Sequence, residues 1–234
     1  MKTVKILIPF HKAAEKLEKC LKHVKASDYT DYTIEIQDDS KEEHGFTKTV
    51  NRLITKVLLE APDYLLVLNQ DCYLGEDTIS QLVGFMDNKP NCLVCGVKQV
   101  STENEDVIIH GGTGACYPSG RHEGGLVSKG DCNQFKKVPW VNGACFMIKT
   151  SLLVNVGLLD ENMVMFGSDA DFCYTTRARG FECWYNPKAV VKHEQGISRE
   201  MSSSAQKQFM ADMRYFRDKW ISGDLYKDLA MEIF

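Results

Sequence analysis

Short apolar runs in the N-terminal half end in residues that could form a ligand site. The runs cover residues 4–9, 32–37 and 63–68, and the residues that follow them are Phe10-His11, Asp38-Asp39 and Asn69-Gln70-Asp71. In open parallel sheets, ligands bind where the carboxyl ends of the strands meet. Carboxylate oxygens such as those of Asp71 are ligands that Mn²⁺ and Mg²⁺ prefer. The pattern therefore predicts a site at the strand tips, with Asp71 able to hold a divalent cation.

The distribution of glycine limits the ligands that such a site could bind. The first glycine of the chain is Gly45. Backbone phosphate cradles need glycine, because only glycine lets the backbone wrap around a phosphate. A Walker loop, a GxGxxG dinucleotide fold and the N-terminal loop of sugar-phosphate nucleotidylyltransferases are therefore disfavoured, and the GGTG fragment at 111–114 lacks the strand-to-helix context. A divalent cation offers another way to hold a diphosphate, and it makes the nucleotide a better leaving group.

The elements that would position these residues follow from the hydrophobic pattern. Strands are expected at 4–9, 32–37, 63–68 and 92–97, and amphipathic helices at 13–25, 46–58 and 79–86. This alternation predicts an α/β fold with a mostly parallel, Rossmann-like sheet and helices on both faces.

The second half of the chain has a different pattern. Residues 101–137 are polar and glycine-rich, which predicts a long irregular segment with a functional role. A strand is expected within 138–150, followed by a short helix that ends at Gly157. A further helix is expected from Ser168, as its N-cap, to Gly180, and a terminal helix carries an apolar stripe through Trp220.

Composition excludes several classes of protein. The net charge of −4 and the lack of a basic stripe argue against a nucleic-acid partner. No run approaches the roughly 20 apolar residues of a membrane span, and the N-terminus is not a secretory signal. Nine cysteines, an odd number scattered through apolar runs, predict a reduced, cytoplasmic protein. Cys92 and Cys95 form a lone CxxC that suits core filling better than zinc or redox chemistry.

Six segments follow one another in a characteristic order over about residues 4–200. They are ILIPFHKAAEKLEKCLKHV, IEIQDDS, GFTKTVNRLI, YLLVLNQDCYL, the block from VPWVNGACFMIKT to FGSDADFCYTTRARGF, and VVKHEQGIS. Together they resemble family 2 glycosyltransferases of the GT-A fold, close in pattern to rhamnosyltransferase-like members. The resemblance implies a single GT-A-like domain, with a nucleotide-binding half at 1–98, an acceptor-binding half at 99–200 and a helical tail at 201–234. Within the second half, residues 101–137 would choose the acceptor.

The same resemblance implies an activity and its partners. A metal-dependent, inverting enzyme would move a hexosyl or deoxyhexosyl group from a nucleotide-diphosphate donor of the UDP, dTDP or GDP type to a hydroxyl. The acceptor would be a glycan or lipid-linked glycan, as in polysaccharide biosynthesis, and the cofactor Mn²⁺ or Mg²⁺. No membrane span is expected, which leaves peripheral association with a membrane open.

The resemblance also implies roles for individual residues. Asp71 and His193 would hold the metal, and Asp169 would be the catalytic base that takes the proton of the acceptor hydroxyl. The expected nucleotide-binding residues are Pro9, Phe10, His11, Asp38, Asn51 and Asn69, and the expected donor- or acceptor-binding residues are Trp140, Gly143 and Asp171.

Several of these residues also have simpler interpretations. Asp169 could serve only the dipole of its helix, which would keep it ionised, and Trp140 could serve only core packing. Asp39 is expected to turn outward, beside Asp38 in a solvated turn. Asp171 should not share a task with Asp169, because two positions on a helix differ by about 200°; it would bind the acceptor or the local loop.

Departures from the family pattern keep two rivals open. Asn69 and Ser168 stand where the family commonly has an acid, and Thr175 where it usually has arginine. The rivals are a sugar-phosphate nucleotidylyltransferase and a non-catalytic nucleotide- or carbohydrate-binding module on the same fold.

Overall fold

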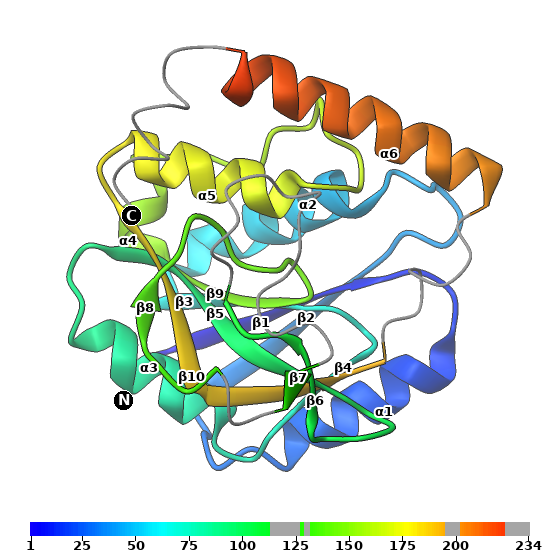
Figure 1. Ribbon diagram of the computed structural model, residues 1–234. Coiled ribbons are helices and arrows are strands. Elements are labelled where there is room, and N and C mark those ends of the chain that lie inside the picture. The colour runs from blue at the N-terminus through cyan, green and yellow to red at the C-terminus, as the bar shows by residue number, and fades with distance from the viewer. Residues whose placement is uncertain (113–126, 129–131, 195–201, 223–234) are drawn as a thin grey trace.

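The computed structural model describes residues 1–112, 127–128, 132–194 and 202–222 (Figure 1). Its strands are β1 (Val4–Phe10), β2 (Tyr32–Asp38), β3 (Tyr64–Leu68), β4 (Cys72–Leu74), β5 (Cys92–Ser101), β6 (Val107–His110), β7 (Val127–Ser128), β8 (Lys136–Lys137), β9 (Cys145–Lys149) and β10 (Glu182–His193). Its helices are α1 (Ala14–Lys25), α2 (Phe46–Val57), α3 (Thr78–Asp87), α4 (Thr150–Leu153), α5 (Ser168–Ala178) and α6 (Ser203–Phe216), with a 3₁₀ turn at Leu58–Glu60 and a π-helical turn at Arg217–Ile221. Among these residues, no helix combines the length and the apolarity that crossing a membrane requires.

The central sheet has the strand order β2-β1-β3-β9-β5-β10-β4. Strands β2, β1, β3, β5 and β10 share one direction, whereas β9 and β4 run the opposite way. The predicted mostly parallel α/β sheet is therefore confirmed. The strand expected within 138–150 is shorter than predicted, since only Cys145–Lys149 pairs, and it lies antiparallel between β3 and β5.

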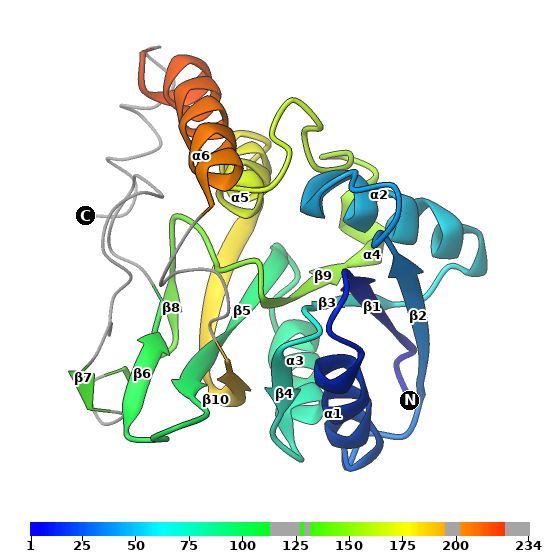
Figure 2. The same cartoon turned by 90° about the vertical axis from the view of Figure 1, so that its right-hand side faces the viewer.

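Helices cover both faces of the sheet, as predicted. In Figures 1 and 2, α2, α5 and α6 lie on one side of the sheet, and α1 and α3 lie on the other. Strand β3 shows why its apolar run is unbroken: Leu65 and Val67 belong to the core under α2 and α5, while Leu66 and Leu68 belong to the core over α1 and α3. A strand buried on both faces needs apolar residues at both alternations.

The start of α5 differs from the prediction. Gly167, with φ of 72°, occupies the N-cap position, and Ser168 is the first helical residue rather than the cap. Among the described residues, the buried Ser168 hydroxyl has no hydrogen-bond partner. The positive φ favours glycine at 167, and a Cβ there would lie 2.5 Å from the Cε atom of Met213 on α6. The helix therefore begins at a close contact with the tail rather than at a side-chain cap.

Buried carboxylates attach the tail to α5 and to the loop that precedes it. Asp212 of α6 accepts hydrogen bonds from the backbone N–H groups of Val164, Met165 and Phe166, the loop that leads into α5. Asp171 of α5 accepts a hydrogen bond of 2.7 Å from the indole Nε1 of Trp220. The expected helical tail is thus present as far as residue 222, and its part at 223–234 lies outside the described residues.

Asp160 makes the stability of this tail dependent on pH. Burial alone would raise the pKa of Asp160, but hydrogen bonds from Lys219, Asn162 and Tyr215 outweigh it and lower the pKa from 3.8 to about 2. A carboxyl group with a lowered pKa contributes stability above its unfolded pKa, and this stability is lost as the pH falls through its folded pKa. We expect Asp160→Asn to lower the free energy of unfolding at pH 7 by on the order of 2 kcal/mol. In urea denaturation, the difference between the wild type and the variant should shrink between pH 5 and pH 3; a constant difference would contradict the assignment.

Candidate active site

The tips of β1 and β2 lie side by side and form one end of the candidate site. In their parallel register Phe10 is opposite Asp38 and Pro9 is opposite Gln37. Asp38 is exposed, and one of its carboxylate oxygens accepts a hydrogen bond from the backbone N–H of Ser40. The hydrogen bonds with Ser40 lower the pKa of Asp38, so the group carries a negative charge at neutral pH. An ionised acceptor at the strand tip is therefore open to a ligand.

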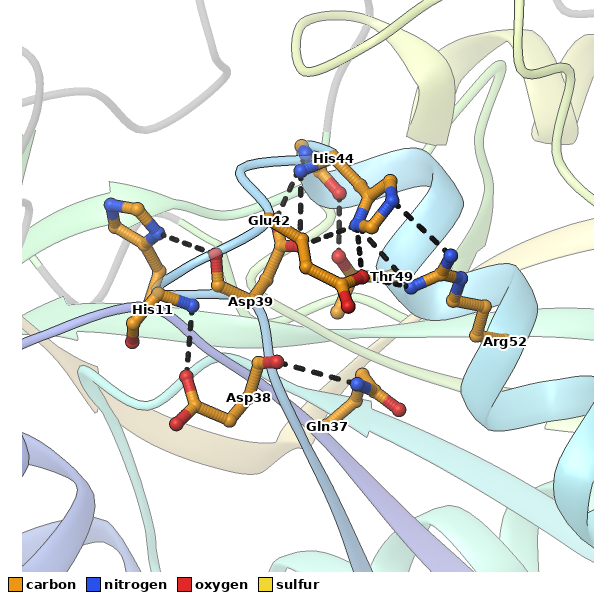
Figure 3. A network of polar contacts seen from close by, with 10 residues as sticks. His11, Gln37, Asp38, Asp39, Glu42, His44, Thr49 and Arg52 are labelled. Carbon is orange, nitrogen blue, oxygen red and sulfur yellow. Dashed lines mark hydrogen bonds and ion pairs between the residues drawn. The ribbon is translucent and has the colours of Figure 1, made fainter.

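Asp39 turns inward, contrary to the outward orientation that the sequence suggested. Its carboxylate accepts hydrogen bonds from the backbone N–H groups of His44 and Gly45 and lies 2.9 Å from the His44 Nδ1 atom (Figure 3). Glu42 lies between His44 and Arg52 in the same network. Asp39 thus holds the loop that connects β2 to α2, and Asp38 is the carboxylate left for a ligand.

Gln70 holds the turn between β1 and α1. Its side-chain oxygen accepts a hydrogen bond from the backbone N–H of His11 at 2.8 Å, and its amide nitrogen donates to the carbonyl oxygens of His11 and Lys12. Lys12 and Ala13 both have positive φ values, 53° and 55°, which are uncommon for residues with a side chain. Gln70 therefore fixes a turn of the expected nucleotide-binding segment that would otherwise be unfavourable.

Asp71 and His193 meet although they are far apart in sequence. Strand β4 pairs antiparallel with the end of β10, which places His193 opposite Cys72. The His193 Nε2 atom lies 3.6 Å from an Asp71 carboxylate oxygen. Burial alone would raise the pKa of Asp71, but His193 and Lys16 outweigh it and lower the pKa, so the carboxylate is ionised at neutral pH.

This pair offers ligands of the types that a divalent cation takes. Ligand atoms of Asp71, Cys72 and His193 lie within 4.8 Å of one another. Burial raises the pKa of the Cys72 thiol well above its usual value, and thiolate is not a ligand type that Mg²⁺ and Mn²⁺ prefer. One carboxylate and one imidazole remain, which leaves positions for diphosphate oxygens and water, as Mg²⁺ and Mn²⁺ commonly require.

Glu194 connects the end of β10 to helix α1, beside Asp71 and His193. Its backbone N–H donates to the carbonyl oxygen of Asp71, and its carboxylate pairs with Lys16 and Lys19 and accepts a hydrogen bond from the Tyr73 hydroxyl. Burial opposes ionisation of Glu194, but these donors lower its pKa to about 2. The ion cluster fixes the position of the residue next to His193.

Asp169 lies at the first turn of α5 against the loop that precedes β9. Its carboxylate accepts a hydrogen bond of 2.6 Å from the backbone N–H of Gly143 and another from the N–H of Ala170. Burial outweighs these donors and raises the pKa of Asp169 above its ordinary value. The helix N-terminus was expected to favour the ionised form of Asp169, whereas burial has the larger effect on its pKa; a carboxylate with a raised pKa is better suited to accept a proton.

Comparison with known proteins identifies the family. Residues 25–214 match the family described as Glycosyltransferase like family 2, which is most of the chain. The chain belongs to this family. Its sheet and helices are those of the GT-A glycosyltransferases to which it is similar in structure.

Solved glycosyltransferase structures share the fold at low sequence identity. GalNAc-T7, in a crystal structure with UDP, GalNAc and Mn²⁺, has a TM-score of 0.70 and 17% identity, over 97% of this chain and 49% of that one. Residues 1–349 of TarS from S. aureus give 0.64 and 12%, over 99% of this chain and 69% of that one. The uncharacterized protein y4gI of Sinorhizobium fredii is 30% identical over 87 residues, which are 36% of this chain and 10% of that protein. The chain thus spans about half of GalNAc-T7 and a tenth of y4gI.

Two residues expected to contact ligands serve the fold of this family 2 domain instead. Asn51 is buried, and its amide bonds the backbone N–H and C=O of Leu159 and the carboxylate of Glu161, so no polar atom remains for a nucleotide. Trp140 is 2% exposed and packs against the ring of His110 at 5.9 Å, which supports the core-packing interpretation.

Gly143 and Asp171 contact other parts of the chain than expected. A Cβ at Gly143 would lie 3.0 Å from an Asp169 carboxylate oxygen, so glycine here permits the close approach of Asp169. Asp171 is 1% exposed and its oxygens are bonded by Trp220 and Lys219, which makes it the anchor of the tail. Burial outweighs these two donors and raises the pKa of Asp171. The two carboxylates of α5 therefore have separate surroundings, as their helical spacing indicated.

Asn69 lies between the Asp71–His193 pair and the loop before β9. Its backbone N–H donates to the carbonyl oxygen of Ala144, and its carbonyl oxygen accepts a hydrogen bond from the N–H of Cys72. Within the described residues its side chain makes no hydrogen bond, so it stays a candidate for contact with the ribose. Of the segment expected at 101–137 to choose the acceptor, residues 113–126 and 129–131 lie outside the described residues.

Proposed function

We propose that this domain is a metal-dependent, inverting glycosyltransferase that moves a hexosyl or deoxyhexosyl group from a nucleoside-diphosphate donor to a hydroxyl of a glycan or lipid-linked glycan. The observation that carries the proposal is the pairing of Asp71 with His193, 3.6 Å apart at the carboxyl end of the sheet. The crystal structure of GalNAc-T7 with UDP and Mn²⁺ supports the choice of a divalent cation and of this donor class.

The donor would lie along the strand tips. Asp38 would accept a hydrogen bond from the base, while Pro9, Phe10 and His11 line the base pocket and Asn69 contacts the ribose. Asp71 and His193 would hold Mn²⁺ or Mg²⁺, which supplies positive charge to the diphosphate oxygens and makes the nucleoside diphosphate a better leaving group. The chain's own contribution here is to orient the donor and to keep two ligands preorganised.

Asp169 would act on the acceptor. It takes the proton from the attacking hydroxyl as the bond to the anomeric carbon forms and the bond to the diphosphate breaks. If the hydroxyl attacks from the face opposite the diphosphate, a single displacement inverts the anomeric centre. A cytoplasmic location and a role in polysaccharide biosynthesis are consistent with this chemistry and belong to the proposal.

A nucleotide panel tests the donor class and the need for metal together. We expect one of UDP, dTDP, GDP and CDP to raise the melting temperature in thermal-shift assays only when Mn²⁺ or Mg²⁺ is present. At a nucleotide concentration 100 times Kd, the stabilisation would be about 2.7 kcal/mol. Metal alone and each nucleotide with EDTA serve as controls. Equal stabilisation by a nucleotide with and without metal would contradict the proposed site.

A further inference from the structure

A buried glutamine connects the proposed metal ligand to the loop that contacts Asp169. Gln99 lies on β5, opposite Val191 of β10, and none of it is exposed. Its amide is within 3.0 Å of the Nδ1 atom of His193 and within 3.0 Å of the side-chain oxygen of Asn142. The same oxygen of Asn142 accepts a hydrogen bond from the backbone N–H of Ala144 at 3.0 Å.

The backbone N–H of Ala144 determines which atom donates in each of these linked hydrogen bonds. A backbone N–H can only donate, so the Asn142 atom that it contacts must be the oxygen. The Gln99 atom that contacts this oxygen must then be the NH₂ group, which leaves the Gln99 oxygen facing His193. An amide oxygen can only accept, so the Nδ1 atom of His193 carries a proton.

The consequence for His193 concerns its other nitrogen. In a neutral imidazole with a proton on Nδ1, the Nε2 atom holds a free lone pair. This is the atom that lies 3.6 Å from the Asp71 carboxylate, within the proposed metal pair. A hydrogen bond from the other ring nitrogen is how proteins commonly orient a metal-ligating histidine.

The Asn142 end of these linked hydrogen bonds lies next to Asp169, the proposed base. Asn142 and Ala144 flank Gly143, whose backbone N–H donates to Asp169 at 2.6 Å. We propose that Gln99 is a positioning residue that fixes the Nδ1–H tautomer of His193 and holds the 142–144 turn in place for Asp169. This inference rests on the proposed function for the role of the tautomer in binding metal.

Two substitutions at Gln99 separate its two contacts. Gln99→Met removes both the acceptor for His193 and the donor to Asn142, and we expect it to weaken Mn²⁺ binding, measured by calorimetry, about 10- to 100-fold. Gln99→Glu keeps an acceptor for His193, loses the donor to Asn142 and adds a negative charge beside the ring. We expect Gln99→Glu to bind Mn²⁺ more tightly than Gln99→Met does, because the acceptor for Nδ1 is kept, and to show a lowered kcat at saturating metal, because the turn at Asp169 is disturbed.

A matched control separates positioning from general destabilisation. Val97→Ala removes apolar volume from the same strand, in the core on the α1 and α3 side, without touching His193. We expect Val97→Ala to lower the melting temperature and to leave Mn²⁺ affinity unchanged. If Gln99→Met binds Mn²⁺ as tightly as the wild type does, the proposal is overturned.

Nuclear magnetic resonance tests the tautomer without any metal or activity. In long-range ¹H–¹⁵N spectra of the metal-free protein at a pH where the ring is neutral, we expect His193 to show a protonated Nδ1 and an unprotonated Nε2. Asp71 favours a proton on Nε2, whereas Gln99 favours a proton on Nδ1. The position of the proton therefore shows which of the two neighbours determines the tautomer of His193. A proton on Nε2 in the wild type would overturn the proposal. Failure of the wild type to bind Mn²⁺ would instead count against the proposed function, since the spectra still report on Gln99.

Discussion

Replacement of Asp169 by asparagine is expected to lower kcat for sugar transfer by about 10²- to 10⁴-fold, the usual contribution of a general base. Asparagine has nearly the same shape and can still accept a hydrogen bond from the Gly143 N–H, but it cannot take a proton from a hydroxyl. Burial raises the pKa of Asp169, so the acid limb of the wild-type kcat profile should lie at a higher pH than the ordinary pKa of aspartate.

Three measurements make the result for Asp169→Asn specific. The variant should keep the metal-dependent nucleotide stabilisation of the wild type, because Asp169 is not among the groups expected to bind the donor. Asp218→Asn, which alters an exposed carboxylate paired with the neighbouring Arg217, should leave kcat unchanged. The anomeric configuration of the wild-type product, assigned by NMR, should be inverted. Full transfer activity in Asp169→Asn, or retention at the anomeric carbon, would rule out this base.

The strand tips could be predicted because local patterns encode them. An apolar run of five residues that ends in Asn69-Gln70-Asp71 requires burial on both faces and then an exposed end, which the two cores on either side of β3 confirm. The same reasoning placed Asp38 at the end of β2. The family pattern supplied His193, whose approach to Asp71 depends on a pairing between β4 and β10 that no local pattern contains.

The residues that sequence reasoning missed act through long-range contacts. Gln99 was beyond the expected end of its strand at residue 97, whereas β5 continues to Ser101 and buries it completely. The available signal was the segment Val97-Lys98-Gln99-Val100, in which two valines enclose a polar pair. Glu194 and Asp212 were unremarkable in the sequence, because their partners lie on α1 and in the loop at 164–166.

Some of the expected ligand residues have partners within the protein for one physical reason. Asn51, Trp140 and Gly143 were assigned to ligands because the family pattern places them near the site, and Gly143 does lie against Asp169. However, side-chain groups in a packed domain satisfy each other first, since a buried polar group without a partner costs about 1–3 kcal/mol. Asn51 and Asp171 have their hydrogen-bonding groups occupied within the chain, which sequence spacing alone cannot show.

Replacement of Asp71 by asparagine is expected to abolish the metal-dependent stabilisation by nucleotide. His193 holds the pKa of Asp71 below its usual value, so the wild-type side chain contributes a full negative charge at pH 7 that asparagine lacks. Loss of a charged ligand should weaken Mn²⁺ binding by on the order of 10²-fold or more, and the loss of several kcal/mol of charge stabilisation should lower kcat/KM about 10³-fold. Calorimetry with Mn²⁺ and the thermal-shift panel measure the first effect, and donor turnover measures the second.

Asp77→Asn is the matched control for Asp71→Asn, because Asp77 is an exposed carboxylate at the start of α3 whose side chain bonds only Gln81 among the described residues. This control should bind Mn²⁺ and nucleotide as the wild type does. Taken with Asp169→Asn, the Asp71 variant also separates an enzyme from a binding module. An enzyme loses transfer in both variants and loses metal-dependent binding only in Asp71→Asn. A module would lose binding in Asp71→Asn and show no transfer in any form, whereas binding that survives in Asp71→Asn would place the cation elsewhere.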